Sequence, residues 1–351
     1  MITLRGLTKR YGDTLAVDGL TCDIKAGRVT GFLGPNGAGK STTMRMILGL
    51  DHPTRGSALI AGRPYASLRR PLCAVGAMLD ARAVHPARSG RTHLVAQARA
   101  NGIPVRRVDE VLETVGLTKA ARRPAGTYSL GMSGRLGVAG ALLGDPPVLV
   151  LDEPVNGLDP DGVRWIRRLV RDRAAEGRTV FLSSHLMSEM QLTADHLVVI
   201  GRGRLLSDTS MAEFLAAASP ASARALVPDP GERATLVRRL MAADGVSVGT
   251  TVAGELTVEG RTAAEIGDLA HHCGVRLHRL SDVRVSLEEA YMDLTARSVE
   301  YATGGSGSGS ARKATEATAT PEATATTVVT GASDAALATD ANVVPHEGEA
   351  R

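Results

Sequence analysis

A glycine-rich segment with one lysine and two hydroxyl side chains is the part of the sequence that points most directly to chemistry. It reads Gly34-Pro35-Asn36-Gly37-Ala38-Gly39-Lys40-Ser41-Thr42 and follows the apolar run 29–33. Glycines let the backbone curl so that its N–H groups point at phosphate oxygens, and a helix beginning near Gly39 adds its partial positive charge. Lys40 would reach the β- and γ-phosphates, and the Ser41 hydroxyl would hold Mg²⁺. The segment therefore predicts a nucleoside triphosphate site rather than a ligand-free strand-to-helix turn.

A second strand supplies the carboxylates that such a site needs. Residues 148–151 are all apolar, which indicates a buried parallel strand, and the pair Asp152-Glu153 follows directly. Asp152 is placed to hold Mg²⁺, and Glu153 is placed to polarise an attacking water, because a general base must lie within hydrogen-bond reach. An acidic pair that stood alone would instead indicate a solvated loop. Together with the phosphate loop it predicts hydrolysis of the triphosphate.

Four further segments are similar to motifs of one family. They are Thr8-Lys9-Arg10-Tyr11-Gly12, Thr127-Tyr128-Ser129-Leu130-Gly131-Met132, Asn156-Gly157-Leu158-Asp159 and Phe181-Leu182-Ser183-Ser184-His185. With the phosphate loop and the acidic strand, they resemble the ATP-binding subunits of ABC transporters. The second segment resembles the signature motif in the "SLGM" form of drug-export and resistance ATPases.

The resemblance implies roles for residues in three of these segments. Ser129 and Gly131 take the signature positions that contact the γ-phosphate bound by the opposite subunit. Asp159 belongs to the D-loop, and His185 takes the place of the H-loop histidine that touches the γ-phosphate. Without the resemblance, a histidine at a strand end would indicate only a satisfied hydrogen bond.

Two more residues acquire roles from the same resemblance. Tyr11 matches the aromatic residue that stacks on adenine, although an isolated tyrosine near an N-terminal strand more often packs in the core or at its rim. Asp80 takes a position where the family usually has Gln and this branch often has an acidic residue. It would approach the γ-phosphate only through Mg²⁺ or water, and the alternative is a solvated turn residue.

The signature region also departs from the family pattern. Ser133-Gly134-Arg135 lacks the usual Gln, and Gly134, Gly137 and Gly140 recur every third residue in the predicted helix. Each glycine costs about 1 kcal/mol relative to alanine in a helix interior, so this helix is expected to be soft. The same spacing also suits close packing of another helix.

Length and composition are consistent with one large core and a smaller satellite in 351 residues. The apolar runs are too short to span a bilayer, the N-terminus lacks signal-peptide features, and the three cysteines are scattered. We therefore expect a cytoplasmic protein that joins the inner face of the membrane through another chain. The net charge of +4 is modest and is explained by ATP and acidic partner loops as readily as by nucleic acid.

The periodicity predicts an α/β fold of the P-loop ATPase type with three parts in its core. An antiparallel β subdomain holds strands 2–7 and 15–24, and a helical subdomain spans about 80–143, with Ser89 as an N-cap and a helix over 105–115. A sheet covered on both faces alternates with helices such as 43–50 and 211–218. Its predicted strands are 29–33, 73–78, 148–151, 179–182 and 196–200, with a hairpin turn at 201–204.

A second, smaller unit is predicted after Pro220. Its elements follow the order β-α-β-β-α-β, which indicates a split βαβ sandwich, and Ser286 begins a final helix with a capping-box pattern. The histidines and cysteine of this unit are too poorly spaced for a zinc site, and a structural or solvated role is preferred. The predicted ranges are strand 224–227, helix 233–243, strands 246–252 and 255–258, helix 263–273 and strand 275–280; the histidines and cysteine are His271, His272, Cys273 and His278.

These patterns divide the chain into an ATPase domain at 1–219, a small α+β domain at 220–302 and a tail at 303–351. The tail consists largely of Gly, Ser, Ala, Thr and Glu, and so cannot bury enough apolar surface to offset the entropy of ordering. We expect it to be disordered.

The expected function is that of an ATP-binding and ATP-hydrolysing subunit that uses ATP and Mg²⁺. The resemblance implies a head-to-tail dimer of two copies or paralogues, which powers export of a drug, antibiotic or lipid-like compound through a separate integral-membrane permease. Two alternatives are a soluble ABC-type ATPase acting on the ribosome or nucleic acid, and a self-resistance ATPase without transport. The permease would select the transported compound.

Overall fold

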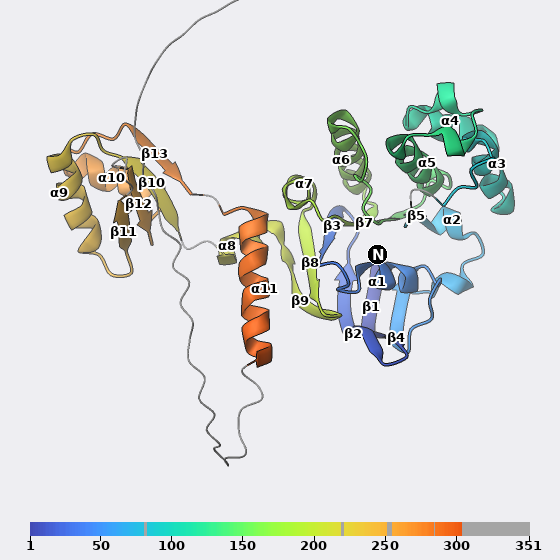
Figure 1. The fold of residues 1–351 in the computed structure, drawn as a ribbon, viewed down its shortest axis with the longest axis horizontal. Helices are drawn as coiled ribbons and strands as arrows, with labels where there is room; N and C mark the ends of the chain where they lie inside the picture. The colour runs from blue at the N-terminus through green and yellow to red at the C-terminus, as the bar shows by residue number, and fades with distance from the viewer. Residues whose placement is uncertain (81–82, 219–220, 251–254, 284, 304–351) are drawn as a thin grey trace, which may run out of the picture. The chain divides into compact units, whose positions relative to one another are not determined.

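The computed structural model describes residues 1–80, 83–218, 221–250, 255–283 and 285–303 (Figure 1). The tail predicted to be disordered lies outside the described residues from position 304 on, as does the second part of the predicted strand 246–252. Among the described helices, none has both the length and the apolar character that a membrane crossing requires.

The main sheet has six strands in the order β5-β6-β7-β3-β8-β9. The first five run parallel, and β9 turns back antiparallel to β8 after the hairpin at 201–204, as predicted. Strands β6 and β7 are buried along their whole length, which explains the unbroken apolar sequence of β6 and the apolar centre of β7. The strands are β3 (Arg28–Leu33), β5 (Val75–Met78), β6 (Val148–Leu151), β7 (Thr179–Ser183), β8 (His196–Gly201) and β9 (Arg204–Ser210).

The predicted strand 73–78 is two residues too long at its start. Pro71–Ala74 forms a short helix, α2, because proline supplies the fixed φ of a first helical turn, and β5 begins only at Val75. The predicted helix 43–50 begins earlier than expected, since α1 spans Lys40–Ile47. Its first turn therefore coincides with the lysine and serine of the phosphate loop.

A second sheet has three antiparallel strands in the order β2-β1-β4. Strands β1 (Ile2–Tyr11) and β2 (Thr14–Ile24) are the predicted pair, and Tyr11 ends β1. Strand β4 (Arg55–Ile60) escaped the sequence analysis because most of it is exposed or half-buried, so it shows no clean alternation. Gly56 is the second residue of β4, and it must be glycine because a Cβ there would lie 2.2 Å from the carbonyl oxygen of Gly6 in β1.

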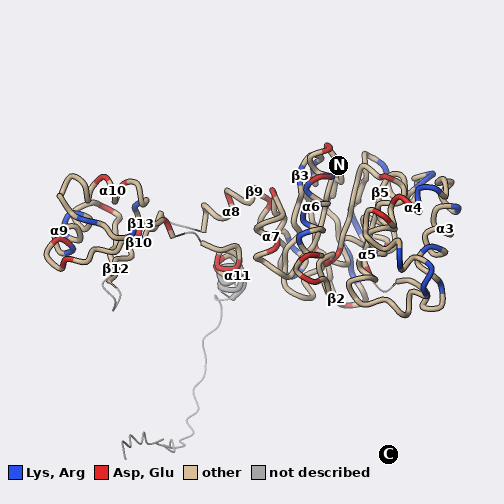
Figure 2. The backbone as a smooth tube through the Cα atoms, turned by 90° about the horizontal axis from the view of Figure 1, so that it is seen from above, with Lys and Arg blue, Asp and Glu red and all other residues tan. Residues whose placement is uncertain are grey.

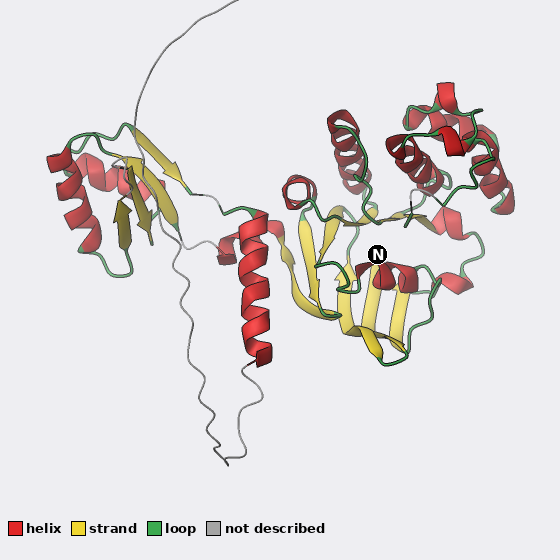
Figure 3. Ribbon diagram, in the orientation of Figure 1, coloured by secondary structure: helices red, strands yellow, loops and turns green. Residues whose placement is uncertain are grey.

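Helix α1 lies between the two sheets (Figure 3). Its buried Met44 and Ile47 belong to one apolar cluster with Ile2 and Leu4 of the small sheet and Phe32 of the main sheet. The opposite face of the main sheet is covered by a second cluster to which the later helices contribute. The main sheet is thus covered on both faces, as the apolar sequences of its strands indicated.

The helical subdomain contains three helices between β5 and β6, and the structure confirms that this stretch lacks strands within its described residues. Ser89 is an N-cap whose side chain accepts from the Thr92 N–H, as predicted. Short 3₁₀ turns lie at Thr118–Ala120 and Ala125–Thr127, and another, Tyr65–Ser67, precedes α2. The helices are α3 (Gly90–Ala100), α4 (Arg106–Thr114) and α5 (Leu130–Leu142).

The glycines of α5 differ in their surroundings. A Cβ at Gly140 would meet the Gln97 side chain of α3 at 3.1 Å, so this position suits close packing between helices. A Cβ at Gly134 would meet nothing within 4 Å. Close packing therefore explains Gly140 but not Gly134.

Three more helices complete the ATPase core. They are α6 (Pro160–Ala175), α7 (Met187–Thr193) and α8 (Met211–Ala218), the last with the predicted bounds.

Residues 222–282 form a sheet and an apolar core of their own. The order β-α-β-β-α-β is confirmed, and the four antiparallel strands lie in the order β11-β12-β10-β13. The last strand is confirmed, but its predicted bounds, 275–280, lie too early in the chain. Val275 closes α10 by donating its N–H to the Ala270 carbonyl, and the strand begins at Arg279. The elements are β10 (Ser222–Leu226), α9 (Pro230–Met241), β11 (Ser247–Thr250), β12 (Glu255–Glu259), α10 (Ala263–His272) and β13 (Arg279–Asp282).

The last helix, α11 (Leu287–Thr303), packs on the ATPase core. Ser286 and Glu289 form the predicted capping box, since each side chain bonds the backbone N–H of the other. Leu287, Ala290 and Tyr291 are buried in the same apolar cluster as α6 and α7. The Leu287 N–H also donates to Oε1 of Gln191 in α7 at 3.0 Å.

Candidate functional site

The phosphate loop connects the buried end of β3 to α1. Gly37 and Gly39 have φ of 80° and 102°, a conformation that L side chains rarely adopt. Gly34 has another reason to be glycine, because a Cβ there would lie 2.6 Å from the Ile200 carbonyl oxygen. Helix α1 begins directly after the loop, so its N-terminal N–H groups face the space that the loop encloses.

Lys40 lies against its own loop. Its ammonium donates to the carbonyl oxygens of Gly34 at 2.6 Å and Pro35 at 3.2 Å, and the residue is only 8% exposed. Burial lowers the pKa of this ammonium, an effect that the nearby carboxylates of Glu153 and Asp152 oppose. The cation is therefore held at the loop with few water contacts.

Asp152 connects the phosphate loop to the strand beside it. Its carboxylate accepts from the Ser41 hydroxyl at 2.7 Å and, through the other oxygen, from the Ser183 hydroxyl. The backbone N–H of Asp152 donates to the Met78 carbonyl at the end of β5 at 2.8 Å. Parallel strands β5, β6 and β7 thus bring Met78, Asp152 and Ser183 together at their carboxyl ends, and Ser41 reaches the same edge from the loop after β3.

The same oxygens suit a magnesium ion. Mg²⁺ prefers hard oxygen ligands and is usually held by one or two protein groups together with substrate phosphates and waters. The Ser41 hydroxyl and the Asp152 carboxylate already meet at hydrogen-bond distance beside the loop. Within the described residues, no group of three or more His, Cys, Asp or Glu side chains could by itself hold a metal ion.

Glu153 is fixed in a strained conformation. Its φ of 52° lies in the left-handed region, and its N–H donates to the Ser183 hydroxyl at 2.9 Å. His185 holds the carboxylate, because its N–H and its Nδ1 lie 3.2 and 2.8 Å from Oε2 of Glu153. The sequence motif 181–185 predicts no role for Ser183, yet this residue connects Asp152 to Glu153.

Tyr11 lies at the edge of the site with 47% of its surface exposed. Its hydroxyl donates to Asp51 at 2.8 Å, and the Lys9 ammonium lies 4.8 Å from the ring centroid. Arg45 first, and then Tyr11, hold the pKa of Asp51 down at about 2, so this carboxylate stays ionised at neutral pH. Asp51 gave no signal in the sequence, because it is an isolated acidic residue beyond α1.

The signature segment and the D-loop lie against each other in one chain. Ser129 is exposed at the N-terminus of α5, where its hydroxyl accepts from the Met132 N–H at 3.2 Å. A Cβ at Gly131 would lie 3.0 Å from the Gly157 carbonyl oxygen. Asp159 is likewise exposed and caps α6 by accepting from the Gly162 N–H at 2.9 Å.

Asp80 lies two residues beyond the end of β5 and is exposed. Its backbone oxygen accepts from the Ala83 N–H at 3.4 Å, across the pair 81–82 that the structure does not describe. Its predicted approach to the γ-phosphate stays a prediction, as do the roles of Tyr11, Ser129, Gly131 and Asp159.

Comparison with known proteins gives family matches for both parts of the chain. Residues 17–156 match the family described as ABC transporter, and residues 227–288 match a domain of unknown function. The bacitracin transport ATP-binding protein BcrA of Bacillus licheniformis is 42% identical over 211 residues, which cover 59% of this chain and 69% of that protein. YhcH of Bacillus subtilis, an uncharacterized ABC transporter ATP-binding protein, is 34% identical and covers 86% of this chain and 97% of its own.

Solved structures agree on the fold. CbiO1 from Clostridium perfringens, part of the ABC transporter complex CbiONQ, has a TM-score of 0.54 at 30% identity and covers 61% of this chain and 90% of its own. A dimeric bacterial ABC transporter cassette has a TM-score of 0.56 at 23% identity, covering 60% of this chain and 99% of its own. These matches do not favour an ATPase that acts on the ribosome or on nucleic acid. The chain belongs to the ATP-binding proteins of ABC transporters, and it is an ATP-hydrolysing subunit.

Proposed function

We propose that the chain hydrolyses ATP between its phosphate loop and the signature segment of a second copy or paralogue, and that closure of this dimer drives export through a separate membrane permease. One observation supports this most directly. Hydrogen bonds join Ser41, Asp152, Ser183, Glu153 and His185 into a single set beside the phosphate loop. The set brings metal-binding oxygens next to a carboxylate suited to orienting water.

In this proposal Lys40 binds the β- and γ-phosphates. It already points its ammonium into the loop, where two carbonyl oxygens stand in as acceptors. Phosphate oxygens are stronger acceptors, so ATP would replace these carbonyls as its partners. Mg²⁺, when bound by Ser41 and Asp152, supplies the positive charge that neutralises the phosphates, and the Asp80 carboxylate would approach the γ-phosphate only through this ion or a water.

Glu153 is proposed to orient the attacking water. Both bonds from His185 go to Oε2, so the carboxylate is held through one oxygen while the other would accept from water. His185 would then contact the γ-phosphate when ATP is bound. Ser129, Gly131 and Asp159 would close the site from the second protomer, with the N-terminus of α5 favouring the negative phosphate.

The variant Glu153→Gln tests this proposal. It keeps the size of the side chain and removes the charge, so ATP should bind while hydrolysis falls by about 10²–10⁴-fold. Because the bound ATP would persist, size-exclusion chromatography with Mg-ATP should show a stable dimer. Lys40→Ala serves as the control and should neither bind ATP nor dimerise. Hydrolysis by Glu153→Gln at the wild-type rate, or a strictly monomeric variant saturated with ATP, would contradict the assignment.

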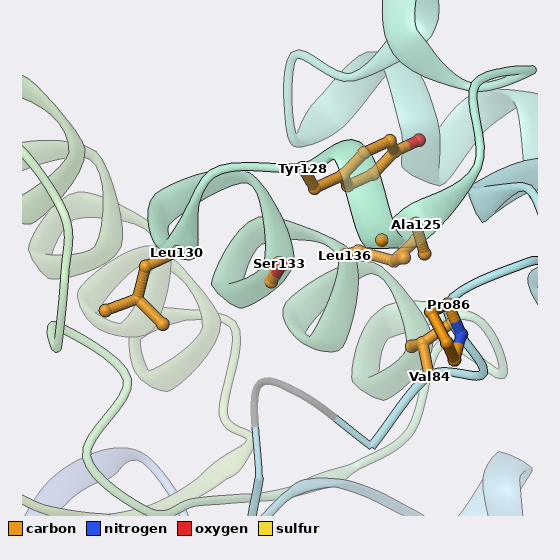
Figure 4. A pocket seen from close by; sticks show the side chains of 8 residues that line it. Val84, Pro86, Ala125, Tyr128, Leu130, Ser133 and Leu136 are labelled. Atoms are coloured by element: carbon orange, nitrogen blue, oxygen red, sulfur yellow. The ribbon is translucent and has the colours of Figure 1, made fainter.

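A groove on the helical subdomain supports a permease partner. It has a volume of about 450 Å³ and is lined mostly by apolar side chains (Figure 4). Val84 and Pro86, from the segment after β5, face residues of α5 and of the turn before it. The lining residues are Val84, Pro86, Ala125, Gly126, Tyr128, Leu130, Ser133 and Leu136. Leu130 and Ser133 belong to α5, so a segment seated here would contact the signature helix directly.

The cargo and location follow from the same proposal. Relatives are named for bacitracin transport, lantibiotic transport and Nod factor export, so we propose a drug, antibiotic or lipid-like compound as cargo. The chain would then lie at the cytoplasmic face of the membrane, held there by the permease.

A further inference from the structure

An ion pair joins the two helices that follow the catalytic loops. Arg167 of α6 donates through Nη2 to Oε2 of Glu189 in α7 at 2.6 Å. The side chains are only 26% and 24% exposed, which sets this pair apart from ordinary surface ion pairs. Helix α6 carries many other basic residues (Figure 2).

The pair lies directly behind both catalytic loops. Arg167 and Glu189 line a cavity of about 10 Å³ together with residues of the two loops. From the segment after Glu153 come Pro154 and Val155, and from the segment before His185 come Leu182, Ser183 and Ser184. The cavity holds at most one water, so the pair is not a site for a larger ligand.

Glu189 is also connected to His185 through a short stretch of chain. It follows the histidine by four residues, on the seven-residue helix α7. Leu186, between them, donates its N–H to the Ser184 hydroxyl at 3.0 Å. A displacement of α7 would therefore be transmitted to His185 through few bonds.

The hydrogen bond from Leu287 to Gln191 joins α7 to α11 and not to α6. The contacts of α7 with the main sheet are of a different kind. Met190 is buried, and its sulfur would lie 2.3 Å from a Cβ placed on Gly31 of β3. Such apolar contacts resist separation of the helix from the sheet, but they are non-directional. A short, partly buried ion pair adds a fixed distance and direction.

We propose that Arg167 and Glu189 are positioning residues, which set the contact between His185 and Glu153 by joining α7 to α6. This inference rests on the proposed roles of Glu153 and His185. The pair touches neither the phosphate loop nor Tyr11, so it acts on the hydrolysis step and not on nucleotide binding.

Substitution of each partner tests the proposal on the full chain. Glu189→Gln and Arg167→Met should lower kcat by roughly ten- to hundredfold, the effect expected when a catalytic group is misplaced by about 1 Å. KM for Mg-ATP and the Kd for a fluorescent ATP analogue should stay within about twofold. Arg167→Lys, which retains the charge, should keep most of kcat. The double variant Arg167→Glu with Glu189→Arg exchanges the two charged side chains. It again forms a pair of opposite charges, so it should recover most of kcat.

A matched control is available on the same helix. Arg164 pairs with Asp161 at 3.3 Å, but these side chains are 74% and 84% exposed, so Arg164→Met should leave kcat unchanged. Wild-type kcat in both Glu189→Gln and Arg167→Met would overturn the proposal. So would a parallel loss of kcat and nucleotide affinity that follows a fall in Tm. Glu153→Gln separates the two hypotheses: if it still hydrolyses ATP, the catalytic roles themselves are wrong.

Discussion

Glu153 shows how much of the site depends on a single backbone conformation. A residue other than glycine with φ of 52° costs on the order of 1 kcal/mol, so surrounding contacts must hold it there. Ser183 bonds its N–H and His185 bonds its carboxylate. The sequence identified Glu153 and His185 as two separate candidates, but their contact, the strain and the bridging hydroxyl of Ser183 are visible only in the structure.

Tyr11 allows a prediction at the same scale. Lys9 covers one face of the ring, and we propose that the other face stacks on adenine. Stacking of a base on an aromatic ring contributes about 1–3 kcal/mol, so Tyr11→Ala should raise the Kd for Mg-ATP by about tenfold or more. Isothermal titration calorimetry measures this directly.

The variant Tyr11→Phe separates stacking from the hydrogen bond to Asp51. It keeps the ring and loses the hydroxyl, so its Kd should stay within about threefold of the wild type. Equal weakening by the two substitutions would show that the bond to Asp51, rather than the ring, carries the contribution of Tyr11.

At the scale of elements, the sequence predicted the strands and helix caps that have a local signal, and it missed or misplaced strands that depend on long-range packing. The core strands, the Ser89 cap and the capping box at Ser286 were predicted, because each has a local signal. Strand β4 was missed because its partner β1 lies about fifty residues away and its own pattern is mostly exposed. Strand β13 was misplaced because apolar Val275 serves a helix end.

The residues of the site were likewise predicted only in part. Lys40, Ser41, Asp152 and Glu153 follow from strand-loop-helix patterns, and the structure brings them together. The Arg167–Glu189 contact could not be predicted, since it depends on how two helices pack and neither residue belongs to a recognised pattern.

Helix α5 provides a prediction about stability. Gly134 lies in the helix interior, and a Cβ there would meet nothing within 4 Å. Gly134→Ala should therefore raise the free energy of unfolding by about 0.5–1 kcal/mol, through the lower entropy of the unfolded chain. Urea denaturation at constant m-value measures the change.

Replacing Gly76 by alanine is expected to have the opposite effect on stability. A Cβ there would lie 1.8 Å from the Ala141 carbonyl oxygen, so Gly76→Ala should lower the free energy of unfolding by about 1–3 kcal/mol. If Gly134→Ala is more destabilising than Gly76→Ala, glycine at position 134 is required for a packing contact that the surroundings of Gly134 do not show.

At the scale of the whole molecule, the groove in Figure 4 makes the permease proposal testable. Val84→Asp places a charge among apolar lining residues, so the subunit should no longer co-purify with its permease from detergent extracts. Nucleotide binding by the isolated subunit should persist, because the groove and the phosphate loop are formed by different residues.

A charge placed elsewhere on the subunit is the control for this experiment. Thr114→Asp lies on the exposed end of α4, outside the groove lining, and should leave co-purification intact. Retention of the permease by Val84→Asp would remove the groove from the proposed interface.

The return of α11 to the ATPase core affects how the chain folds. Residues 222–282 are bracketed by α8 and α11, and both helices contribute to one apolar cluster. Docking α11 therefore closes a long loop, and the entropic penalty of closure grows with the length of free chain between the two anchors. Compaction of the inserted unit shortens that free chain, so its folding and the seating of Leu287 reinforce each other. An amino-acid change buried among β10, β12 and α10 would accordingly loosen α11, even though it lies in a different apolar cluster.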